Sequence, residues 1–521
     1  QLCSCSTTMS TTALHALLLL SLLSCSSARS SSEWAKRSIY QVVTDRFATS
    51  DLSSPACDTA AGKYCGGTFQ GLQGKLDYVK GMGFNAIWIS PVVENTDNGY
   101  HGYWAKNIFS INSHFGTAAE LKSLVKACHD ADIWVMVDVV ANHVGPQSPG
   151  AATNDFSSYM PFNSPDHFHS FCEISQNDWD TMNQYDIEHC RLANLPDLNQ
   201  DNDFVRTTLK KWIQNLVEEF GFDGIRIDTV AEVDKQFWAE FAEAAGVFAT
   251  GEVLNGDPTY TYAYADSVGS VLDYPLFFPL RDAFMDRSDM HTFSSKLDEL
   301  STAAASHGKQ GILPAFVDNH DNRRFLCHTA GVQSNDWTLL KNALAVVLLG
   351  KHIPVVYYGT EQGFTGCDDP SNREALFGKY DTSSLLYSFL VHMHAARTMA
   401  EDHASFFDHS PVTCVTDSPS SVFAASRGSM LLVANNFGSD AQEHEVVVQL
   451  PPSFPAHVTF VDLLGDPSAS EGLSVENGKV TVRVSNGQPR VLVPRDWVIP
   501  PSPPLPPPSA SVGMQGRGVV A

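Results

Sequence analysis

Two patterns of apolar residues alternate along the chain from Trp34 to about residue 405. Short, nearly continuous apolar runs are typical of buried strands. Between them, apolar residues recur every three or four positions, as on one face of a helix. Helices are expected at Leu72–Gly81, Leu121–Cys128 and Val205–Phe220. Strands are expected at Ile39–Thr44, Ala86–Ile89, Val135–Val140, Gly224–Asp228, Val247–Glu252, Ser270–Tyr274, Leu313–Val317 and Pro354–Tyr357. Repeated βα units of this length favour an α/β fold, a (β/α)8 TIM barrel.

Two stretches depart from this rhythm. About sixty residues rich in Asn, Asp, Ser, Pro and His follow the third strand. A structureless loop of that length is uncommon, so we expect a small inserted domain. After about residue 408 only short strands with intervening turns are expected, at Val422–Ser426, Met430–Asn435, Glu445–Leu450, His457–Leu463, Val480–Val484 and Arg490–Val493. This second pattern predicts a separate C-terminal antiparallel β domain.

The ends of the chain suggest a secreted protein. The apolar run Ala13 to Leu23 follows Met9, is too short to span a bilayer, and precedes small residues suited to a signal peptidase. No other stretch approaches the ~18 apolar residues of a membrane helix, so the mature form is expected to be free of the membrane. The predicted division is a leader and signal peptide (1–32), the barrel (33–141 and 204–407), the inserted domain (142–203), a C-terminal β-sandwich (408–498) and a Pro-rich disordered tail (499–521).

Charge and composition narrow the possible partners. The chain carries 33 basic and 58 acidic residues, a formal net charge of −25. Such a chain repels nucleic acid and anionic lipid, so neither is expected as a partner. Its 43% hydrophobic and 10% aromatic residues suffice for a large packed core. We therefore expect a globular protein, and a monomer.

The cysteines fit an oxidising compartment. Two local pairs bracket short polar segments and suit disulfides that staple loops; they are Cys57 with Cys65 and Cys172 with Cys190. Cys327 and Cys367 each follow a predicted barrel strand, and whether they pair stays open.

Acidic residues stand at the carboxyl ends of three predicted strands. In the strand GIRID, Arg226 and Asp228 alternate with two isoleucines and should face the barrel interior. The neighbouring cation favours the ionised form of Asp228, as a nucleophile requires. Glu252 ends the next strand among apolar residues, which would raise its pKa and suit it to act as a general acid. Asp321 follows a later strand. Three acids at one barrel mouth point to glycosidic bond cleavage.

Seven ordered motifs then identify a resemblance. They are GYHGYW (99–104), VDVVANH (137–143), LPDL (195–198), GIRIDTV (224–230), GEVLNGD (251–257), DNHDN (318–322) and DPSNREA (369–375). With these motifs the chain resembles the α-amylases of glycoside hydrolase family 13, closest to the fungal secreted type. The resemblance covers Trp34 to about residue 400, and the C-terminal β domain fits the same architecture.

The resemblance implies a role for each motif residue. Asp228 would be the nucleophile, Glu252 the acid and then the base, and Asp321 would bind sugar hydroxyls and stabilise the transition state. Such enzymes retain the anomeric configuration, and their substrates are starch, glycogen and maltooligosaccharides. The implied substrate-binding residues are Tyr103, Trp104, His143, Arg226, His320, Asp369 and Arg373.

The resemblance also implies a calcium ion between the barrel and the inserted domain. Asn142, Glu188 and Asp197 match its ligand positions, together with the main-chain carbonyl of Glu232. Hard oxygen ligands from separate segments suit Ca²⁺. The pairs Cys57–Cys65 and Cys172–Cys190 match the family's two earlier disulfides.

One departure keeps an alternative open. Fungal enzymes continue GIRIDTV with Lys-His, where this chain has Ala231 and Glu232. Those side chains help to hold sugars on the leaving-group side, so a related transglycosylase is the main alternative. Cyclodextrin-forming relatives carry additional domains that are not expected here, which favours hydrolysis. A catalytically inactive carbohydrate-binding homologue is the third reading, and the presence of all three acids argues against it.

Overall fold

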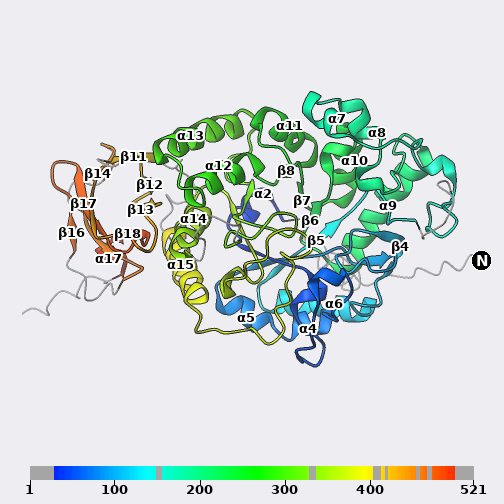
Figure 1. Cartoon of the computed structure of the whole chain (residues 1–521), viewed down its shortest axis with the longest axis horizontal. Helices are drawn as coiled ribbons and strands as arrows, with labels where there is room; N and C mark the ends of the chain where they lie inside the picture. The colour runs from blue at the N-terminus through cyan, green and yellow to red at the C-terminus, as the bar shows by residue number, and fades with distance from the viewer. Residues whose placement is uncertain are drawn as a thin grey trace, which may run out of the picture.

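A closed barrel of eight parallel strands forms the centre of the molecule (Figure 1). The computed structural model describes residues 29–147, 155–327, 336–402, 412–416, 420–452, 454, 458–465 and 472–498. The strand order is β8-β7-β6-β5-β2-β1-β10-β9, and the amide of Asp273 after β8 donates to the carbonyl of Pro314 in β9 at 2.8 Å. The strands are β1 Ile39–Val42, β2 Ala86–Ile89, β5 Trp134–Val139, β6 Gly224–Ile227, β7 Phe248–Gly251, β8 Ser270–Val271, β9 Pro314–Ala315 and β10 Ile353–Tyr357. The predicted barrel is confirmed.

Side-chain alternation builds two layers of core around these strands. In β5, Trp134 and Met136 face inward and pack with Trp34, while Val135 and Val137 face the surrounding helices. The helices outside the inserted segment and the C-terminal domain are α2 Ser31–Trp34, α3 Thr44–Phe47, α4 Phe69–Gln73, α5 Leu76–Gly81, α6 Ala118–Asp130, α9 Asp203–Phe220, α10 Lys235–Ala245, α11 Pro258–Val268, α12 Tyr274–Phe284, α13 Met290–Ser306, α14 Trp337–Leu349 and α15 Leu385–Glu401.

Local chemistry sets the limits of α9. The side chain of Asn202 accepts hydrogen bonds from the amides of Phe204 and Val205, which caps the first turn. Gly221 ends the helix with φ 74°, a left-handed conformation that glycine adopts without strain. The helix buries Val205, Leu209 and Ile213 against the barrel, as their spacing predicts.

Several predicted elements differ in extent; the strand expected over Leu313–Val317, for example, pairs only at Pro314–Ala315. The helix expected over Leu72–Gly81 is two short helices, α4 and α5, because the chain leaves helical geometry at Lys75. The strand expected to end at Thr44 stops at Val42, and Thr44 begins α3. The strand expected over Ser270–Tyr274 pairs only at Ser270–Val271, because Asp273 caps α12, which begins at Tyr274.

The segment after β5 pairs with a ribbon that the apolar pattern did not reveal. The ribbon consists of β3 Val93–Asn95 and β4 Ala105–Ile111. The amide of Met160 donates to the carbonyl of Lys106 at 2.8 Å, which joins the inserted segment to β4. Two short helices follow, α7 Gln176–Thr181 and α8 Gln184–His189. They lie on the side of the barrel away from the C-terminal strands (Figure 1).

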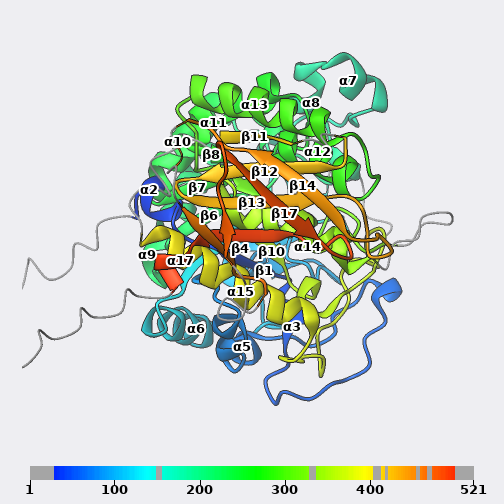
Figure 2. The same ribbon diagram turned by 90° about the vertical axis from the view of Figure 1, so that its left-hand side faces the viewer.

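The C-terminal strands form an antiparallel sheet beside the barrel (Figure 2). In β13, Leu431 and Val433 pack into the core of this domain, whereas Leu432 and Ala434 pack toward the barrel. The elements are β11 Val412–Thr416, β12 Val422–Arg427, β13 Met430–Asn435, β14 His444–Gln449, β15 Thr459–Asp462, β16 Leu473–Ser474, β17 Lys479–Val484, β18 Arg490–Pro494 and α17 Arg495–Val498. Strands β11 and β16 are additions to the sequence prediction.

The leader cleavage site and the Pro-rich tail lie outside the described residues, and the domain limits stay predictions. Among the described helices, none combines the length and apolar character needed to cross a bilayer.

Candidate active site

Two predicted acids leave adjacent strands side by side. Asp228 follows β6 and Glu252 follows β7, each one residue beyond the strand. The hydrogen bonds between neighbouring strands continue through both residues. The amide of Asp228 donates to the carbonyl of Val139 at 3.0 Å, and the amide of Glu252 donates to the carbonyl of Ile227 at 2.8 Å. Both carboxyl groups therefore stand at the carboxyl end of the barrel, where active sites of this fold lie.

The guanidinium of Arg226 joins these acids. Arg226 is fully buried, and its Nη1 donates to Asp228 Oδ1 at 2.8 Å. Its Nη2 lies 2.7 Å from Glu252 Oε2. One planar cation thus sets the spacing of both carboxylates, because its nitrogen atoms have a fixed geometry.

Asp138 was not selected from the sequence, although it lies within the motif VDVVANH. It accepts from Arg226 Nη1 at 3.0 Å, from Tyr103 OH at 2.7 Å and from Trp88 Nε1 at 3.0 Å. Burial raises the pKa of Asp138 to about 7. Its position two residues after inward-facing Met136 is the signal that could have identified it.

The third acid enters from the other side of the mouth. Asp321 follows β9, with His320 Nε2 at 3.0 Å and Arg373 Nη2 at 3.1 Å. Burial opposes ionisation of Asp321, but His320 and Arg373 outweigh it and lower its pKa. Arg373 also pairs with Asp369 at 2.9 Å. Gln41, another residue that sequence reasoning missed, holds His320 through a 2.8 Å hydrogen bond to Nδ1.

Glu252 differs from these groups in protonation. Burial raises its pKa well above the ordinary carboxyl value, Arg226 opposes this, and the charges of Asp321 and Asp228 add to the increase. Tyr274 OH lies 3.4 Å from Glu252 Oε1. A carboxyl group that keeps its proton beside ionised carboxylates can protonate a leaving oxygen.

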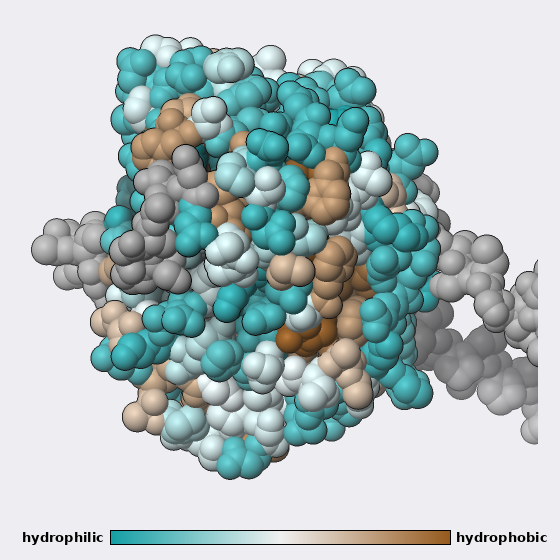
Figure 3. Space-filling view, turned by 90° about the vertical axis from the view of Figure 1, so that its right-hand side faces the viewer, coloured by the Kyte–Doolittle hydropathy of each residue, from teal (hydrophilic) through white to brown (hydrophobic). Residues whose placement is uncertain are grey.

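One cleft of about 680 Å³ collects the predicted residues. Nine of the ten catalytic and substrate-binding candidates line it, and Arg226 lies buried beneath them. The Tyr103 ring stacks on His320 with 5.1 Å between centroids. The cleft also takes in residues that were not predicted, including Trp179, Leu254 and Tyr260. On the face turned away from the C-terminal domain, apolar side chains gather near the middle among hydrophilic ones (Figure 3).

The two residues that differ from the fungal enzymes after the motif GIRIDTV also lie in this cleft. Ala231 and Glu232 are part of its lining. Glu232 is 8% exposed, and burial raises its pKa to about 8. A small residue and a buried acid therefore occupy the place where the resembling enzymes carry two basic side chains.

Three of the four predicted calcium ligands come together. The segments around Asn142 and Asp197 pair through a hydrogen bond of 2.8 Å from the amide of Leu198 to Asn142 O. The Asn142 amide group then lies 3.1 Å from Asp197 Oδ1 and 3.1 Å from the carbonyl of Glu232. Glu188 is not part of this contact. It accepts from Gln184 Nε2 at 2.8 Å and lines a neighbouring cavity.

No cluster of three or more His, Cys, Asp or Glu side chains in the described ranges is arranged to hold a metal. The candidate calcium site consists instead of the Asn142 amide group and the main-chain carbonyl of Glu232 beside the carboxylate of Asp197.

Three disulfides are present in the described part of the chain. Two are the predicted pairs Cys57–Cys65 and Cys172–Cys190. The third is Cys327–Cys367, which the sequence left open. It joins the segment that carries Asp321 to the segment that carries Arg373.

Comparisons with known proteins agree with this geometry. The family described as alpha amylase, catalytic domain, matches residues 41–438. An α-amylase of Saccharomycopsis fibuligera is 40% identical over 474 residues, covering 89% of this chain and 92% of that protein.

Solved structures of α-amylases and of a related glucanotransferase are also similar to this chain. An α-amylase from Malbranchea cinnamomea has a TM-score of 0.83 at 36% identity, covering 90% of this chain and 98% of that one. CldA, a cyclomaltodextrin glucanotransferase described as having a three-domain ABC distribution, has a TM-score of 0.73 at 27% identity, covering 87% of this chain and 98% of that one. The family match spans most of the chain, and the chain belongs to the α-amylase family of glycoside hydrolases.

Proposed function

We propose that the protein is a retaining, endo-acting α-amylase that hydrolyses internal α-1,4-glucosidic bonds of starch, glycogen and maltooligosaccharides. The observation that carries the proposal is the shared guanidinium of Arg226, which holds Asp228 and Glu252 at one barrel mouth. Retaining glycosidases need two carboxyl groups close enough to act on one anomeric carbon from opposite sides.

The chemistry follows from the protonation states. Glu252, protonated, donates its proton to the glycosidic oxygen while Asp228 attacks the anomeric carbon and forms a covalent glycosyl-enzyme. Glu252, now ionised, then takes a proton from water, and the resulting hydroxyl displaces Asp228 with a second inversion. Asp321, held by Arg373 and His320, binds hydroxyl groups of the distorted sugar ring.

The remaining cleft residues position the glucan. Tyr103 offers a ring face beside His320, and Trp104 lies next to it on the cleft wall. His143 Nε2 is buried without a hydrogen-bond partner among the described residues, which leaves it available for a sugar hydroxyl. Asp369 and Arg373 would contact glucose units toward the non-reducing end.

We also propose one bound Ca²⁺. In one amide orientation the oxygen of Asn142 faces Asp197 Oδ1 and the carbonyl of Glu232, each at 3.1 Å. Three oxygens in such contact fit a hard cation between them. Glu188 would complete the set after a shift of its side chain. The ion would supply charge that holds the inserted segment against the barrel and takes no part in bond cleavage.

Secretion as a monomer completes the proposal. Three disulfides among the described residues fit an oxidising compartment, as does the leader pattern.

Transglycosylation is the second candidate, and the lining of the leaving-group side by Ala231 and Glu232 favours it. CldA, which this chain resembles, is a cyclomaltodextrin glucanotransferase described as having a three-domain distribution, so the number of domains does not separate the two candidates. Incubation with maltoheptaose separates the candidates. Hydrolysis predicts only products shorter than the substrate, and longer products would establish glycosyl transfer. Asp228→Asn should abolish both activities, and equal inactivity of the wild type and this variant would instead favour a binding protein.

A further inference from the structure

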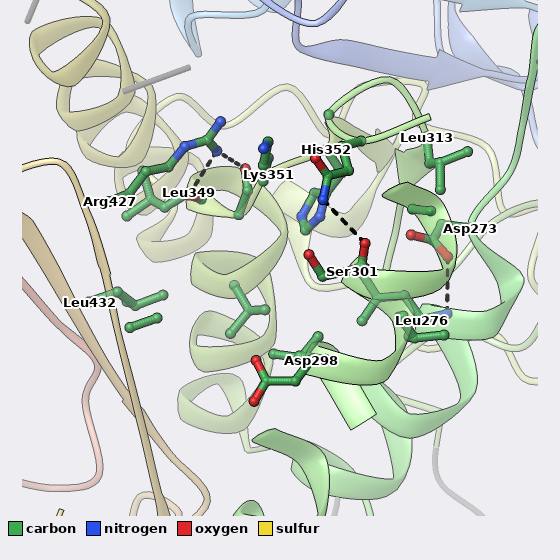
Figure 4. Close-up of a pocket in the computed structure, with 18 of the residues that line it drawn as sticks. Asp273, Leu276, Asp298, Ser301, Leu313, Leu349, Lys351, His352, Arg427 and Leu432 are labelled. Atoms are coloured by element: carbon green, nitrogen blue, oxygen red, sulfur yellow. Dashed lines mark hydrogen bonds between the residues drawn. The ribbon is translucent and has the colours of Figure 1, made fainter. Parts of the chain in front are cut away.

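A second cavity, which shares no lining residue with the catalytic cleft, lies between the barrel and the C-terminal domain (Figure 4). Leu313 and His352, on its wall, immediately precede β9 and β10. Since the strands are parallel, this is the end of the barrel opposite Asp228 and Glu252. We call this space the interdomain cavity.

The walls of the interdomain cavity are mainly aliphatic and come from both domains. From the barrel side, α13 contributes the largest share, with residues of α14 and of the segments before β9 and β10, and β12 and β13 close the other side. Representative members are Leu300, Leu313, Val346, Leu349, Phe423 and Leu432. The cavity measures about 130 Å³. Apolar cavities of about 150 Å³ in other proteins admit a ligand of benzene size.

The entrance is polar. Asp298 on α13 and Gln310 in the following loop are exposed and line the same cavity. Gln310 Nε2 donates to Ser301 O at 3.2 Å, beside the opening. A small molecule can therefore reach the aliphatic interior without unfolding of either domain.

Two polar side chains, His352 and Asp273, lie on this apolar wall. His352 is 8% exposed, and its ring bonds to the backbone of Val346 and Val347. Its Nε2 has no partner among the described residues. Burial, with Arg427 nearby, lowers the pKa of His352 to about 3, so the ring is neutral. Its Nε2 has almost no accessible surface and is therefore not presented to the cavity.

Asp273 supplies an acceptor that faces the cavity. Its Oδ1 accepts from Tyr262 OH at 2.7 Å and from the amide of Leu276 at 3.2 Å. In Figure 4 its other oxygen points toward the interior of the cavity. A buried acceptor without a donor is costly, so a ligand that supplies one gains free energy there.

The cations at the cavity are engaged by the protein. Arg427 Nη1 donates to the carbonyls of Leu349 and Gly350 at the end of α14, as the dashed lines in Figure 4 show. A ligand anion would have to compete with these carbonyls. A sugar would leave several hydroxyl groups against aliphatic walls, which is unfavourable.

We propose that the interdomain cavity is a binding site for a small one-ring alcohol or phenol. Its ring fills the aliphatic space, and its hydroxyl donates to the inward oxygen of Asp273. The ligand contacts both domains, so it stabilises their association without touching the glucan cleft.

Thermal unfolding with benzyl alcohol as the probe tests this proposal. Toluene is the matched compound without a donor, and benzoate is the matched anion. Because an aromatic solute can lower Tm non-specifically, each response is compared with that of Ala304→Leu, which fills the cavity from α13. Binding to the native state alone should raise Tm in a saturable way. We expect the wild type to gain Tm relative to Ala304→Leu with benzyl alcohol, to gain less with toluene, and to gain least with benzoate.

Two further variants keep the test decisive. Ala425→Leu fills the cavity from β12 and replaces Ala304→Leu if that variant fails to fold. Asp273→Asn keeps the shape of the side chain and replaces the inward carboxylate oxygen with an amide group, so benzyl alcohol should lose its advantage over toluene. Starch hydrolysis serves as a folding control and should be unchanged in all three. An equal benzyl alcohol response in the wild type and the filled variant, or a larger response to benzoate, would overturn the proposal.

Discussion

Arg226 shows how one residue organises the chemistry of the site. Its guanidinium contacts Asp138, Asp228 and Glu252, and none of its surface is exposed. A buried cation surrounded by three carboxyl groups is stable only because each neighbour satisfies it. The same arrangement gives the acids different roles. Asp228 accepts a hydrogen bond of 2.8 Å from Arg226, whereas burial favours the protonated form of Glu252.

Glu252→Gln should remove the general acid and leave the cleft intact. The amide has the shape of the carboxyl group but cannot protonate a leaving oxygen, so kcat on maltoheptaose should fall by about 10²–10⁴-fold. Calorimetry should show maltoheptaose binding within a few-fold of the wild type. Loss of binding together with activity would mean that Glu252 supports the fold rather than the chemistry.

The raised pKa of Glu252 sets the sign of one pH effect. The acid works only when protonated, so activity is present below its folded pKa and lost as pH rises through it. Since burial raises that pKa well above 4.5, the alkaline limb of kcat/KM should lie well above the range of an ordinary carboxyl group. An alkaline limb near pH 4.5 would contradict the assignment.

Periodicity predicted the barrel elements because buried strands and amphipathic helices leave strong local patterns. The runs around Val135 and Gly224, for example, became β5 and β6. Ribbon β3–β4 escaped because its burial is mixed, with no regular alternation for a pattern to detect. Likewise, the motifs identified the acids, but Gln41 depends on a contact with His320 across 279 residues, which no local signal encodes.

The disulfide Cys327–Cys367 ties together the two segments that present Asp321 and Arg373. Replacing both cysteines by serine should loosen this side of the cleft and raise KM for maltooligosaccharides several-fold, with a smaller change in kcat. Removal should also cost about 2–4 kcal/mol of stability, as is typical for disulfides. Steady-state kinetics at a temperature well below Tm separates the two effects.

The matched control removes Cys57–Cys65, a disulfide that joins neither the segment of Asp321 nor the segment of Arg373. That double serine variant should lose stability with KM unchanged. The same KM in both variants would show that the third disulfide does not position the substrate.

At the scale of the whole molecule, three parts meet at the barrel. The inserted segment approaches it near Asn142, and the C-terminal sheet packs its second face against it through residues such as Leu432. The sequence indicated these parts from changes in pattern, but not their contacts. The interdomain cavity is such a contact, formed by α13 and β12 from distant positions in the chain.

Chelation should destabilise the calcium-bound protein. An ion that binds only the native state stabilises it by mass action, so EDTA should lower Tm and added Ca²⁺ should restore it. Asp197→Asn weakens the proposed ligand set and should make Tm insensitive to EDTA. An unchanged Tm on chelation of the wild type would remove calcium from the account.

Trapping the covalent intermediate tests the central claim most directly. A fluorinated maltosyl fluoride slows hydrolysis of the glycosyl-enzyme, so that peptide mass spectrometry can locate the attached sugar. The account predicts a single glycosyl group on the carboxylate of Asp228, and none in Asp228→Asn. A sugar on Glu252 or Asp321, or turnover of the reagent with inverted anomeric configuration and no adduct, would contradict it.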